Sequence, residues 1–346
     1  MPRKWEGYKI GKIYNDEGWL NWNYLYPECK FIMSITGPRG TGKTYGLLKY
    51  IAEHDIRFIY IRRLKSQLDN VASGEENNPF KSINDDIGTC IYPERKHGAC
   101  RFIDKSTDEP KVLGYGVALS TVATIRGSDY SDVECIVYDE FIAMKNERPI
   151  KAEYQAFMNF LETVNRNREL KGYKPVKVFM LGNANKLMNP YYLEWGFMKT
   201  ALKMIRGGQM VWRNQDNSRI MILLLNSPIS EQKRQTALYQ NASDDFITMA
   251  IDNSFETDPT AIGARPLTDC RHIVSFGSIG IYQLKSTGEH YISETVNRSL
   301  YYEENAINLV FFQARFSLLK QLYIYGGILF ENYDAEMLFR EYFNIA

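Results

Sequence analysis

A glycine-rich segment is the part of this sequence whose residue types and spacing most clearly predict chemistry. Residues 37–44 read GPRGTGKT and lie between an apolar run and an amphipathic run. Glycines let consecutive backbone N–H groups turn inward around phosphate oxygens, and a helix that begins here points its positive dipole end at them. The full match to G-x-x-x-x-G-K-[ST] between a strand and a helix therefore predicts a loop that binds nucleotide phosphates.

The polar residues of this loop have distinct expected roles. Lys43 would reach the β- and γ-phosphates, and the Thr44 hydroxyl would coordinate Mg²⁺. Arg39 has two interpretations of equal weight: a cation that faces the γ-phosphate of its own chain, or a surface residue that pairs with a neighbouring carboxylate. The remaining residues expected to line the nucleotide are Gly37, Gly40, Thr41 and Gly42.

Two adjacent acids, Asp139 and Glu140, follow the apolar run CIVY. In a parallel α/β sheet the carboxyl ends of the strands lie at the edge that also holds the phosphate loop. We expect Asp139 to hold Mg²⁺, directly or through water, and Glu140 to orient and deprotonate the attacking water. A single carboxylate at a strand end is often only a turn former, but a tandem pair favours hydrolysis. A small-molecule kinase of this class would gain nothing from activating water.

Polar residues also lie at the ends of two later elements. Arg166 and Arg168 end an amphipathic helix, where the helix dipole favours Arg, and either could instead be an arginine finger for the ATP of a neighbouring subunit. The residues alone favour the dipole interpretation. Asn183 ends an apolar strand, where it would bind the attacking water or the γ-phosphate, or cap the following turn.

A basic cluster ends the strand that follows the first helix. Arg62, Arg63 and Lys65 lie within IRRLK and could face DNA phosphates, although a solvated basic edge is the more common role for such residues.

The elements that position these residues alternate between strands and helices. Amphipathic runs predict helices over 44–54 and 151–170, and apolar runs predict strands at 31–37, 57–63, 115–123, 134–140 and 175–185. This order is typical of an α/β fold with a mostly parallel sheet covered on both faces. The spacing of the motifs fits the P-loop NTPase class that has a catalytic Glu and an additional strand between the two motif strands. Residues 66–109 have weak periodicity and predict an irregular, partly mobile insertion.

Three segments follow from the change of pattern along the chain. Residues 1–228 would form the P-loop ATPase domain, and the polar residues 229–260 would form a helical linker. Residues 261–346 begin with three short strands separated by Gly-containing turns and continue as helices, which predicts a smaller α+β domain.

Composition limits the classes of function. The net charge is +1, with 42 Lys and Arg against 41 Asp and Glu, so a DNA-binding surface would have to be local. The 5 Cys form no CxxC pair, which favours reduced thiols in a cytosol over a disulfide scaffold or a zinc site. No apolar run is typical of a signal peptide or long enough to span a bilayer, so no membrane partner is expected.

Four segments together carry a family resemblance. FIYIRRLK, VYDEFI, ETVNRNRE and LGNANKLMNPYYL follow the GxRGxGKT loop and resemble the DNA packaging ATPases of small protein-primed podophages, which are terminase-like motors. The resemblance covers residues 31–193 by motif and the remainder by domain order. It implies an ATP- and Mg²⁺-dependent homomeric ring, expected to be a pentamer, in the host cell cytoplasm. The ring would dock on the portal of a procapsid and translocate double-stranded DNA into it, with a scaffold RNA as a further candidate partner.

The resemblance also implies roles for individual residues. Arg166 matches the family's trans-acting finger, which reverses the preference given above, and Lys65 falls in a loop near the DNA channel. The C-terminal domain would be RNase H-like. Its first strand, HIVSFGS, has no Asp or Glu, whereas a two-metal nuclease needs clustered carboxylates. We therefore expect a nuclease-dead domain that binds DNA, packaging partners or the portal.

Two other functions fit the same motifs. A single-strand helicase or conjugation-type pump would also hydrolyse ATP, and single-stranded rather than duplex DNA would stimulate it. A non-motor nucleotide switch with a protein-binding C-terminal module would stay monomeric with ATP, DNA and portal.

Overall fold

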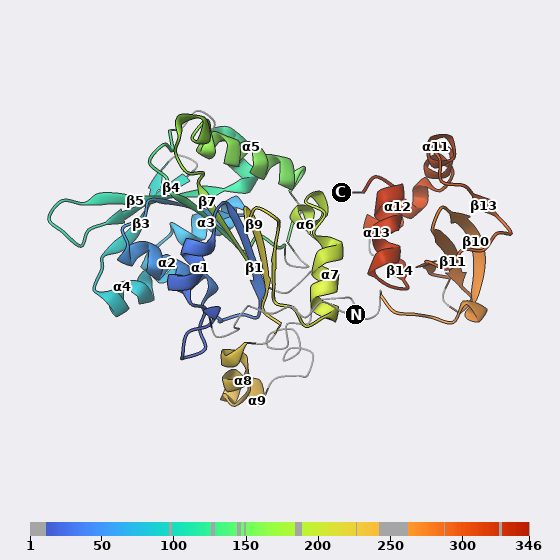
Figure 1. Cartoon of the computed structure of the whole chain (residues 1–346), viewed down its shortest axis with the longest axis horizontal. Helices are drawn as coiled ribbons and strands as arrows, with labels where there is room; N and C mark the ends of the chain where they lie inside the picture. The colour runs from blue at the N-terminus through green and yellow to red at the C-terminus, as the bar shows by residue number, and fades with distance from the viewer. Residues whose placement is uncertain are drawn as a thin grey trace. The chain divides into compact units, whose positions relative to one another are not determined.

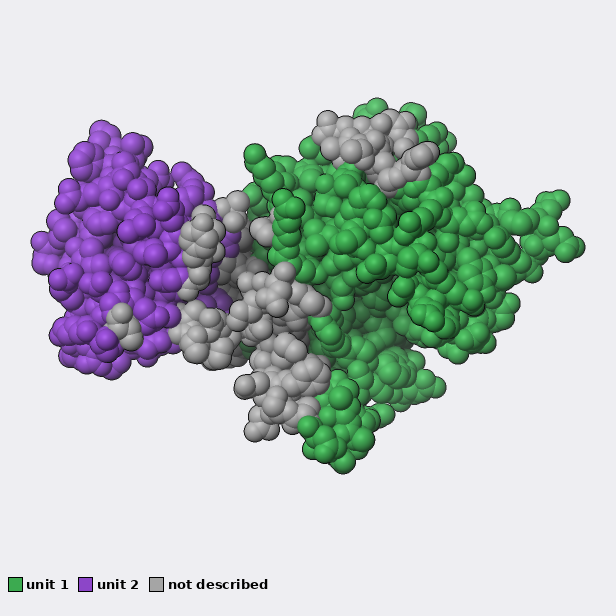
Figure 2. All heavy atoms as spheres, turned by 180° about the vertical axis from the view of Figure 1, so that it is seen from behind, with its two compact units in different colours: residues 1–255 green, residues 256–346 purple. Residues whose placement is uncertain are grey.

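The structure is a computed structural model that describes residues 12–96, 99–125, 129–143, 147–148, 150–183, 189–225, 227–241, 262–286, 288–324 and 327–345. The chain divides into two compact units, Met1–Phe255 and Glu256–Ala346, which Figure 2 colours separately. Within the predicted linker, helices end at Arg234 and at Gln240, and the remainder from residue 242, with the predicted boundary at 260, lies outside the described residues.

A nine-stranded sheet forms the centre of the first unit, in the order β3-β4-β5-β2-β6-β7-β1-β9-β8. The run from β5 to β9 is parallel, and β3, β4 and β8 pair antiparallel with their neighbours. This confirms the predicted α/β fold with a mostly parallel sheet, and β7 separates β1 from β6 as the additional-strand class requires. The strands are β1 Ile32–Gly37, β2 Phe58–Arg62, β3 Ile91–Lys96, β4 Ala99–Asp104, β5 Lys111–Ala118, β6 Cys135–Asp139, β7 Lys177–Asn183, β8 Val211–Arg213 and β9 Arg219–Leu223.

Helices cover both faces of this sheet, because the central strands carry apolar side chains on both faces. Figure 1 shows α1 and α2 on one face and α5 on the other. The helices are α1 Trp22–Glu28, α2 Lys43–Glu53, α3 Lys65–Val71, α4 Lys81–Ile87, α5 Glu153–Asn165, α6 Pro190–Glu194, α7 Met198–Arg206, α8 Pro228–Arg234 and α9 Ala237–Gln240. No helix within the described ranges is long and apolar enough to cross a membrane.

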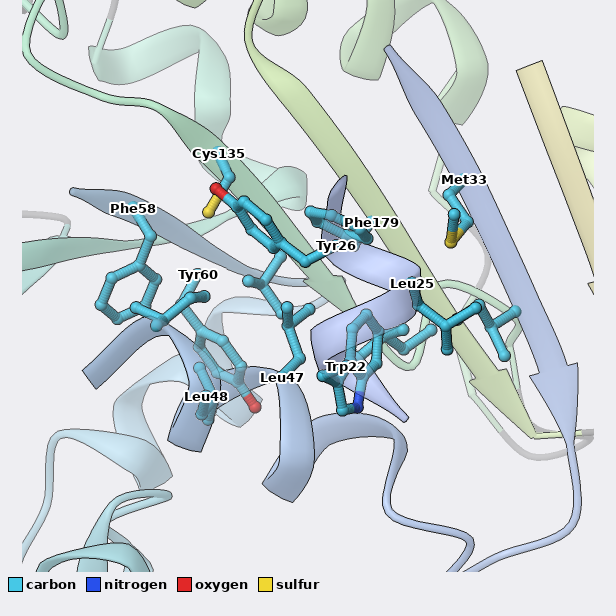
Figure 3. Close-up of a cluster of buried hydrophobic side chains, with 14 of the residues drawn as sticks. Trp22, Leu25, Tyr26, Met33, Leu47, Leu48, Phe58, Tyr60, Cys135 and Phe179 are labelled. Carbon is cyan, nitrogen blue, oxygen red and sulfur yellow. The ribbon is translucent and has the colours of Figure 1, made fainter. Parts of the chain in front are cut away.

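An aromatic cluster lies behind the glycine-rich loop. Trp22 and Tyr26 of α1 contact Phe179 of β7, with ring centroids 5.6 and 5.1 Å apart. Figure 3 shows these rings beside Leu47 of α2. Because Trp22 Nε1 also donates a hydrogen bond of 3.0 Å to the carbonyl of Gly42, the packing of α1 fixes the end of the loop.

Residues 66–109 form regular structure, so the prediction of an irregular, partly mobile insertion is wrong. They include most of α3, all of α4, and the antiparallel hairpin β3–β4, which extends the sheet beyond β5. Phe80 and Phe102 are fully buried and pack against Phe58 of β2. The edge strand β3 carries Pro93 and charged residues at exposed positions, which obscures the alternation typical of a strand.

The second unit contains a five-stranded sheet in the order β13-β10-β11-β12-β14. The strands β10, β11 and β12 form the predicted antiparallel meander. Helices follow them along the chain, so the smaller α+β domain is confirmed. The short strand β14 interrupts the region predicted as helical and pairs parallel with β12. The elements are β10 Cys270–Phe276, β11 Ile279–Leu284, β12 His290–Ser293, β13 Tyr301–Tyr302, α11 Ala306–Arg315, α12 Ser317–Ile324, β14 Ile328–Phe330 and α13 Tyr333–Tyr342.

The RNase H-like and nuclease-dead assignments of this unit stay predictions. In the part of the chain that the structure describes, no group of three or more His, Cys, Asp and Glu side chains could hold a metal ion.

Candidate nucleotide-binding site

The glycine-rich loop joins the fully buried strand β1 to α2, which begins at Lys43. Gly40 and Gly42 have φ values of +66° and +83°, in the left-handed region where a Cβ is disfavoured. The backbone N–H of Leu20 donates to the carbonyl of Thr41 at 3.3 Å, so the segment before α1 also holds the loop. The predicted strand–loop–helix context is therefore present.

The Lys43 ammonium lies inside this loop. Its Nζ is hydrogen-bonded to the carbonyls of Gly37 and Pro38 at 3.0 and 2.6 Å, and the residue is 7 % exposed. Burial lowers the pKa of Lys43 to about 7, against the opposing effect of the nearby Asp139 carboxylate. Phosphate oxygens at this position would favour the charged form of Lys43 far more than neutral carbonyls do.

The residues predicted to hold Mg²⁺ are in direct contact. The Thr44 hydroxyl donates a hydrogen bond of 2.6 Å to Oδ1 of Asp139, and the Tyr60 hydroxyl donates one of 2.6 Å to Oδ2. Burial raises the pKa of Tyr60, so its hydroxyl keeps its proton. Hydroxyl and carboxylate oxygens are ligands that Mg²⁺ prefers. The chemistry and spacing of Thr44 and Asp139 thus fit a magnesium ion.

Arg62 lies between the two acids of the tandem pair. Its Nη1 donates to Oδ2 of Asp139 at 2.8 Å and its Nη2 to Oε2 of Glu140 at 2.5 Å. Because β2 lies beside β6, with Ile61 opposite Tyr138, the end of β2 faces the acids. Glu140 has a φ of +52°, a conformation uncommon for a residue with a side chain and frequent at functional sites.

The sequence predicted that Arg62 would face DNA phosphates, but in the structure its partners are Asp139 and Glu140. The signal that could have identified them is the strand order, which brings the end of β2 beside the tandem acids.

Arg63 points to the opposite side of β2 and is also placed differently from the prediction. It is 1 % exposed, and its Nε and Nη2 donate to the two carboxylate oxygens of Glu153 at 2.9 and 2.8 Å. Its Nη1 donates to Glu147 at 2.5 Å. Arg63 therefore joins β2 to α5 rather than facing a DNA backbone. Lys65 is exposed and pairs with Asp69 at 2.8 Å, and its contact with DNA stays a prediction.

Asn183 and Arg166 lie in different surroundings. Asn183 pairs in register with Gly37 on the neighbouring strand, so it lies beside the start of the loop. Arg166 follows the last residue of α5 with a φ of +41° and is about half exposed. Its Nε donates to the carbonyl of Thr163 at 3.2 Å, and its Nη1 lies 3.7 Å from Asp129. The nucleotide-related roles of both residues stay predictions.

Arg168 has a structural contact close to Arg166. Its Nη2 donates to the carbonyls of Ser131 and Val133 at 2.7 and 2.5 Å, which fixes the segment before β6.

Arg39 is exposed at the tip of the loop, and its carbonyl accepts a hydrogen bond of 2.7 Å from Nζ of Lys233 on α8. Lys233 was not predicted as a site residue. It lies 194 residues further along the chain, in a segment without a motif, so nothing in the sequence pointed to this contact.

Comparisons with known proteins place the chain among phage packaging proteins. The family model described as podovirus DNA encapsidation protein (Gp16) matches residues 15–302. The DNA packaging protein of Bacillus phage phi29 is 30% identical over 189 residues, which is 52% of this chain and 49% of the relative. That of Bacillus phage B103 is 28% identical over 231 residues, 65% of this chain and 64% of the relative. The chain thus spans about half the length of the phi29 relative that it matches.

Solved structures agree with this placement at the level of the fold. The Phi-28 gp11 DNA packaging motor has a TM-score of 0.56 at 18% identity and covers 96% of this chain and 98% of its own. The bacteriophage Phi-29 viral genome packaging motor assembly has a TM-score of 0.53 at 21% identity, with 94% and 99% covered. Because the family model spans most of the sequence, the chain belongs to the podovirus DNA encapsidation protein (Gp16) family.

Proposed function

We propose that this chain is an ATP-driven motor that moves double-stranded viral DNA into a preformed phage procapsid. The observation that carries the proposal is the 2.6 Å contact between Thr44 and Asp139 next to the buried Lys43, in a member of the DNA encapsidation family. Its matched relatives are DNA packaging proteins, and the solved structures that share its fold are packaging motors.

The residues of the site divide the work of hydrolysis. The loop amides and Lys43 would bind the phosphates, and Asn183, which is in register with Gly37, would contact the attacking water or the γ-phosphate. Thr44 and Asp139 would hold Mg²⁺, which supplies charge neutralisation for the β- and γ-oxygens when bound. Glu140 orients the attacking water and accepts its proton.

Arg62 gives this site an inactive arrangement. Its guanidinium engages Glu140 and Asp139 together, so the base is neutralised by an ion pair. In the proposed mechanism the guanidinium of Arg62 competes with the attacking water for the carboxylate of Glu140. Hydrolysis therefore requires that Glu140 exchange Arg62 for the attacking water.

The motor would act as a homomeric ring, with five subunits as the expected number. Arg166, which follows the last residue of α5 and is about half exposed, would act as the arginine finger for the nucleotide of an adjacent subunit. Lys65 would contact the phosphates of DNA, since a motor that ignores sequence must hold the backbone. The expected partners are the portal of the procapsid and, as a further candidate, a scaffold RNA, in the host cytoplasm.

The test is the ATPase rate of the purified chain on empty procapsids with no DNA, duplex DNA or single-stranded DNA. The proposal predicts that duplex DNA and procapsids together raise the rate, and that DNA becomes resistant to nuclease as ATP is consumed. Stimulation by single strands alone would overturn the proposal in favour of a helicase or conjugation-type pump. A chain that stays monomeric and is stimulated by neither DNA would instead be a nucleotide switch.

A further inference from the structure

Three consecutive carbonyls of the glycine-rich loop each accept a hydrogen bond from a lysine ammonium. Lys43 binds those of Gly37 and Pro38 at 3.0 and 2.6 Å, and Lys233 binds that of Arg39 at 2.7 Å. The two lysines therefore make the same kind of contact with adjacent parts of one loop. For Lys43, the loop carbonyls occupy the ammonium that we expect to bind a phosphate.

The shape of the loop leaves room for the second ammonium. Gly40 has no side chain, and a Cβ at this position would collide with Nζ of Lys233. A side chain at Gly40 is thus disfavoured twice, by the Lys233 ammonium and by the backbone φ of +66°. The Lys233 ammonium therefore lies against Arg39 and Gly40, in the loop whose amides would face phosphates.

Helix α8 is held beside the loop by packing that does not involve Lys233. Ile229 of α8 is 7 % exposed. Gly18 packs so closely on Pro228 that an added Cβ would lie 2.9 Å from the Pro228 Cβ. The same N-terminal segment is hydrogen-bonded to the loop from Leu20 to Thr41. Lys233 is therefore presented to the loop by an anchored helix.

The charges of three basic side chains act on one another around the loop. Lys233 and Arg39 both act to lower the pKa of Lys43, so three positive groups lie near one another. Burial lowers the pKa of Lys233 itself. The nearby acids, Asp139 and Glu140, are already engaged by Arg62. A bound polyphosphate would relieve the repulsion among the cations.

We propose that Lys233 is a second phosphate-binding lysine of this site, contributed by α8, which exchanges the Arg39 carbonyl for a phosphate oxygen when nucleotide binds. The inference rests on the proposed ATP-binding function and extends it. It also links the nucleotide to α8, the helix from which the chain continues toward its second unit. Occupancy of the site thereby changes a contact that ties α8 to the loop.

The test compares the full-length chain with Lys233→Ala, Lys233→Arg and the neighbouring exposed control Gln232→Ala. Binding of a non-hydrolysable ATP analogue and of inorganic tripolyphosphate is measured by calorimetry with Mg²⁺. Loss of one charge-assisted hydrogen bond should weaken both ligands about tenfold in Lys233→Ala, and Lys233→Arg should retain most of the affinity. Unchanged affinity in Lys233→Ala, with only a lower melting temperature, would overturn the inference and leave Lys233 as a contact that docks α8.

A second measurement needs no variant at Lys233. Amine acetylation of the wild-type chain, read by mass spectrometry, should show Lys233 protected by the ATP analogue and the surface residue Lys105 unaffected. Lys105 is a suitable reference because it is exposed and pairs with Glu94. Equal labelling of Lys233 with and without ligand would contradict the inference. A parallel titration of Lys43→Ala separates the two proposals. If the wild type binds no nucleotide, the proposed function fails. If Lys43→Ala loses binding and Lys233→Ala does not, only the role of Lys233 fails.

Discussion

Arg62 holds Glu140 through a hydrogen bond of 2.5 Å from Nη2 to Oε2, while its Nη1 binds Asp139 at 2.8 Å. The proposed base and the proposed magnesium ligand thus share one guanidinium. The Arg62 side chain is 15 % exposed, so water screens these contacts only weakly. The proposed mechanism therefore requires that this arrangement be broken before hydrolysis.

Replacing Arg62 by Gln should lower the ratio of duplex-stimulated to unstimulated ATPase rate. Without the guanidinium, Glu140 no longer has to exchange an ion-pair partner for the attacking water before DNA is engaged. The measurement is the steady-state ATPase rate with and without duplex DNA on procapsids. Arg57→Gln is the matched control, because Arg57 makes a 3.2 Å pair with Asp132 that is partly exposed. An unchanged ratio in Arg62→Gln would show that Arg62 does not restrain the base.

Mixtures of two inactive variants should test whether Arg166 acts between subunits. Arg166→Ala should bind ATP but not hydrolyse it, since removal of an arginine finger lowers the rate by about 10³–10⁵-fold. Glu140→Gln should also bind without hydrolysis, because it lacks the base. If the finger acts in trans, mixing the two variants restores some active sites, and part of the ATPase rate returns. A rate in the mixture no higher than that of either variant would place Arg166 outside the neighbouring site.

Arg63 should contribute to stability rather than to DNA binding. Arg63→Ala leaves Glu153 buried without its ion-pair partner, which should lower the free energy of unfolding by about 3–5 kcal/mol. Urea denaturation followed by circular dichroism measures the loss. The exposed control Lys65→Ala breaks only the surface pair with Asp69 and should change stability by less than about 1 kcal/mol. Normal stability with weakened DNA binding in Arg63→Ala would restore the original prediction.

Nucleotide affinity should fall as the pH rises above about 7, the pKa that burial gives Lys43 in the free chain. The ammonium form binds phosphate, and a bound phosphate raises the pKa of Lys43, so binding takes up a proton above this pH. The affinity for ADP with Mg²⁺ should therefore decrease by up to about tenfold per pH unit and level off below pH 7.

Calorimetry in two buffers of different ionisation enthalpy measures the proton uptake directly. Lys43→Arg keeps its charge at all these pH values and should remove the dependence. A flat affinity profile in the wild type would show that Lys43 is already charged throughout the range.

The core of the site could be predicted from the sequence because its chemistry depends on contiguous residues. The loop amides, Lys43 and Thr44 lie within one segment, and the tandem acids lie at the end of one apolar strand. The same periodic apolar runs predicted the central parallel strands and the C-terminal meander, since both are buried elements with regular patterns.

The remaining contacts depend on pairings between distant segments. The partnership of Arg62 with Glu140 follows from the position of β2 beside β6, and that of Lys233 with the loop follows from the packing of α8. Arg63 was predicted as a surface cation because its buried partner Glu153 lies in a different element. The hairpin β3–β4 was missed because a polar edge strand shows little apolar periodicity.

The central claim is that residues 37–44, with Asp139 and Glu140, form a magnesium-nucleotide site. Calorimetric titration of the full chain with ATP, in the presence and absence of Mg²⁺, tests it most directly. The account predicts one nucleotide bound per chain, tighter binding with Mg²⁺ than without it, and loss of binding in Lys43→Ala. A wild-type chain that takes up no ATP, or one whose binding is the same in Lys43→Ala, would contradict it.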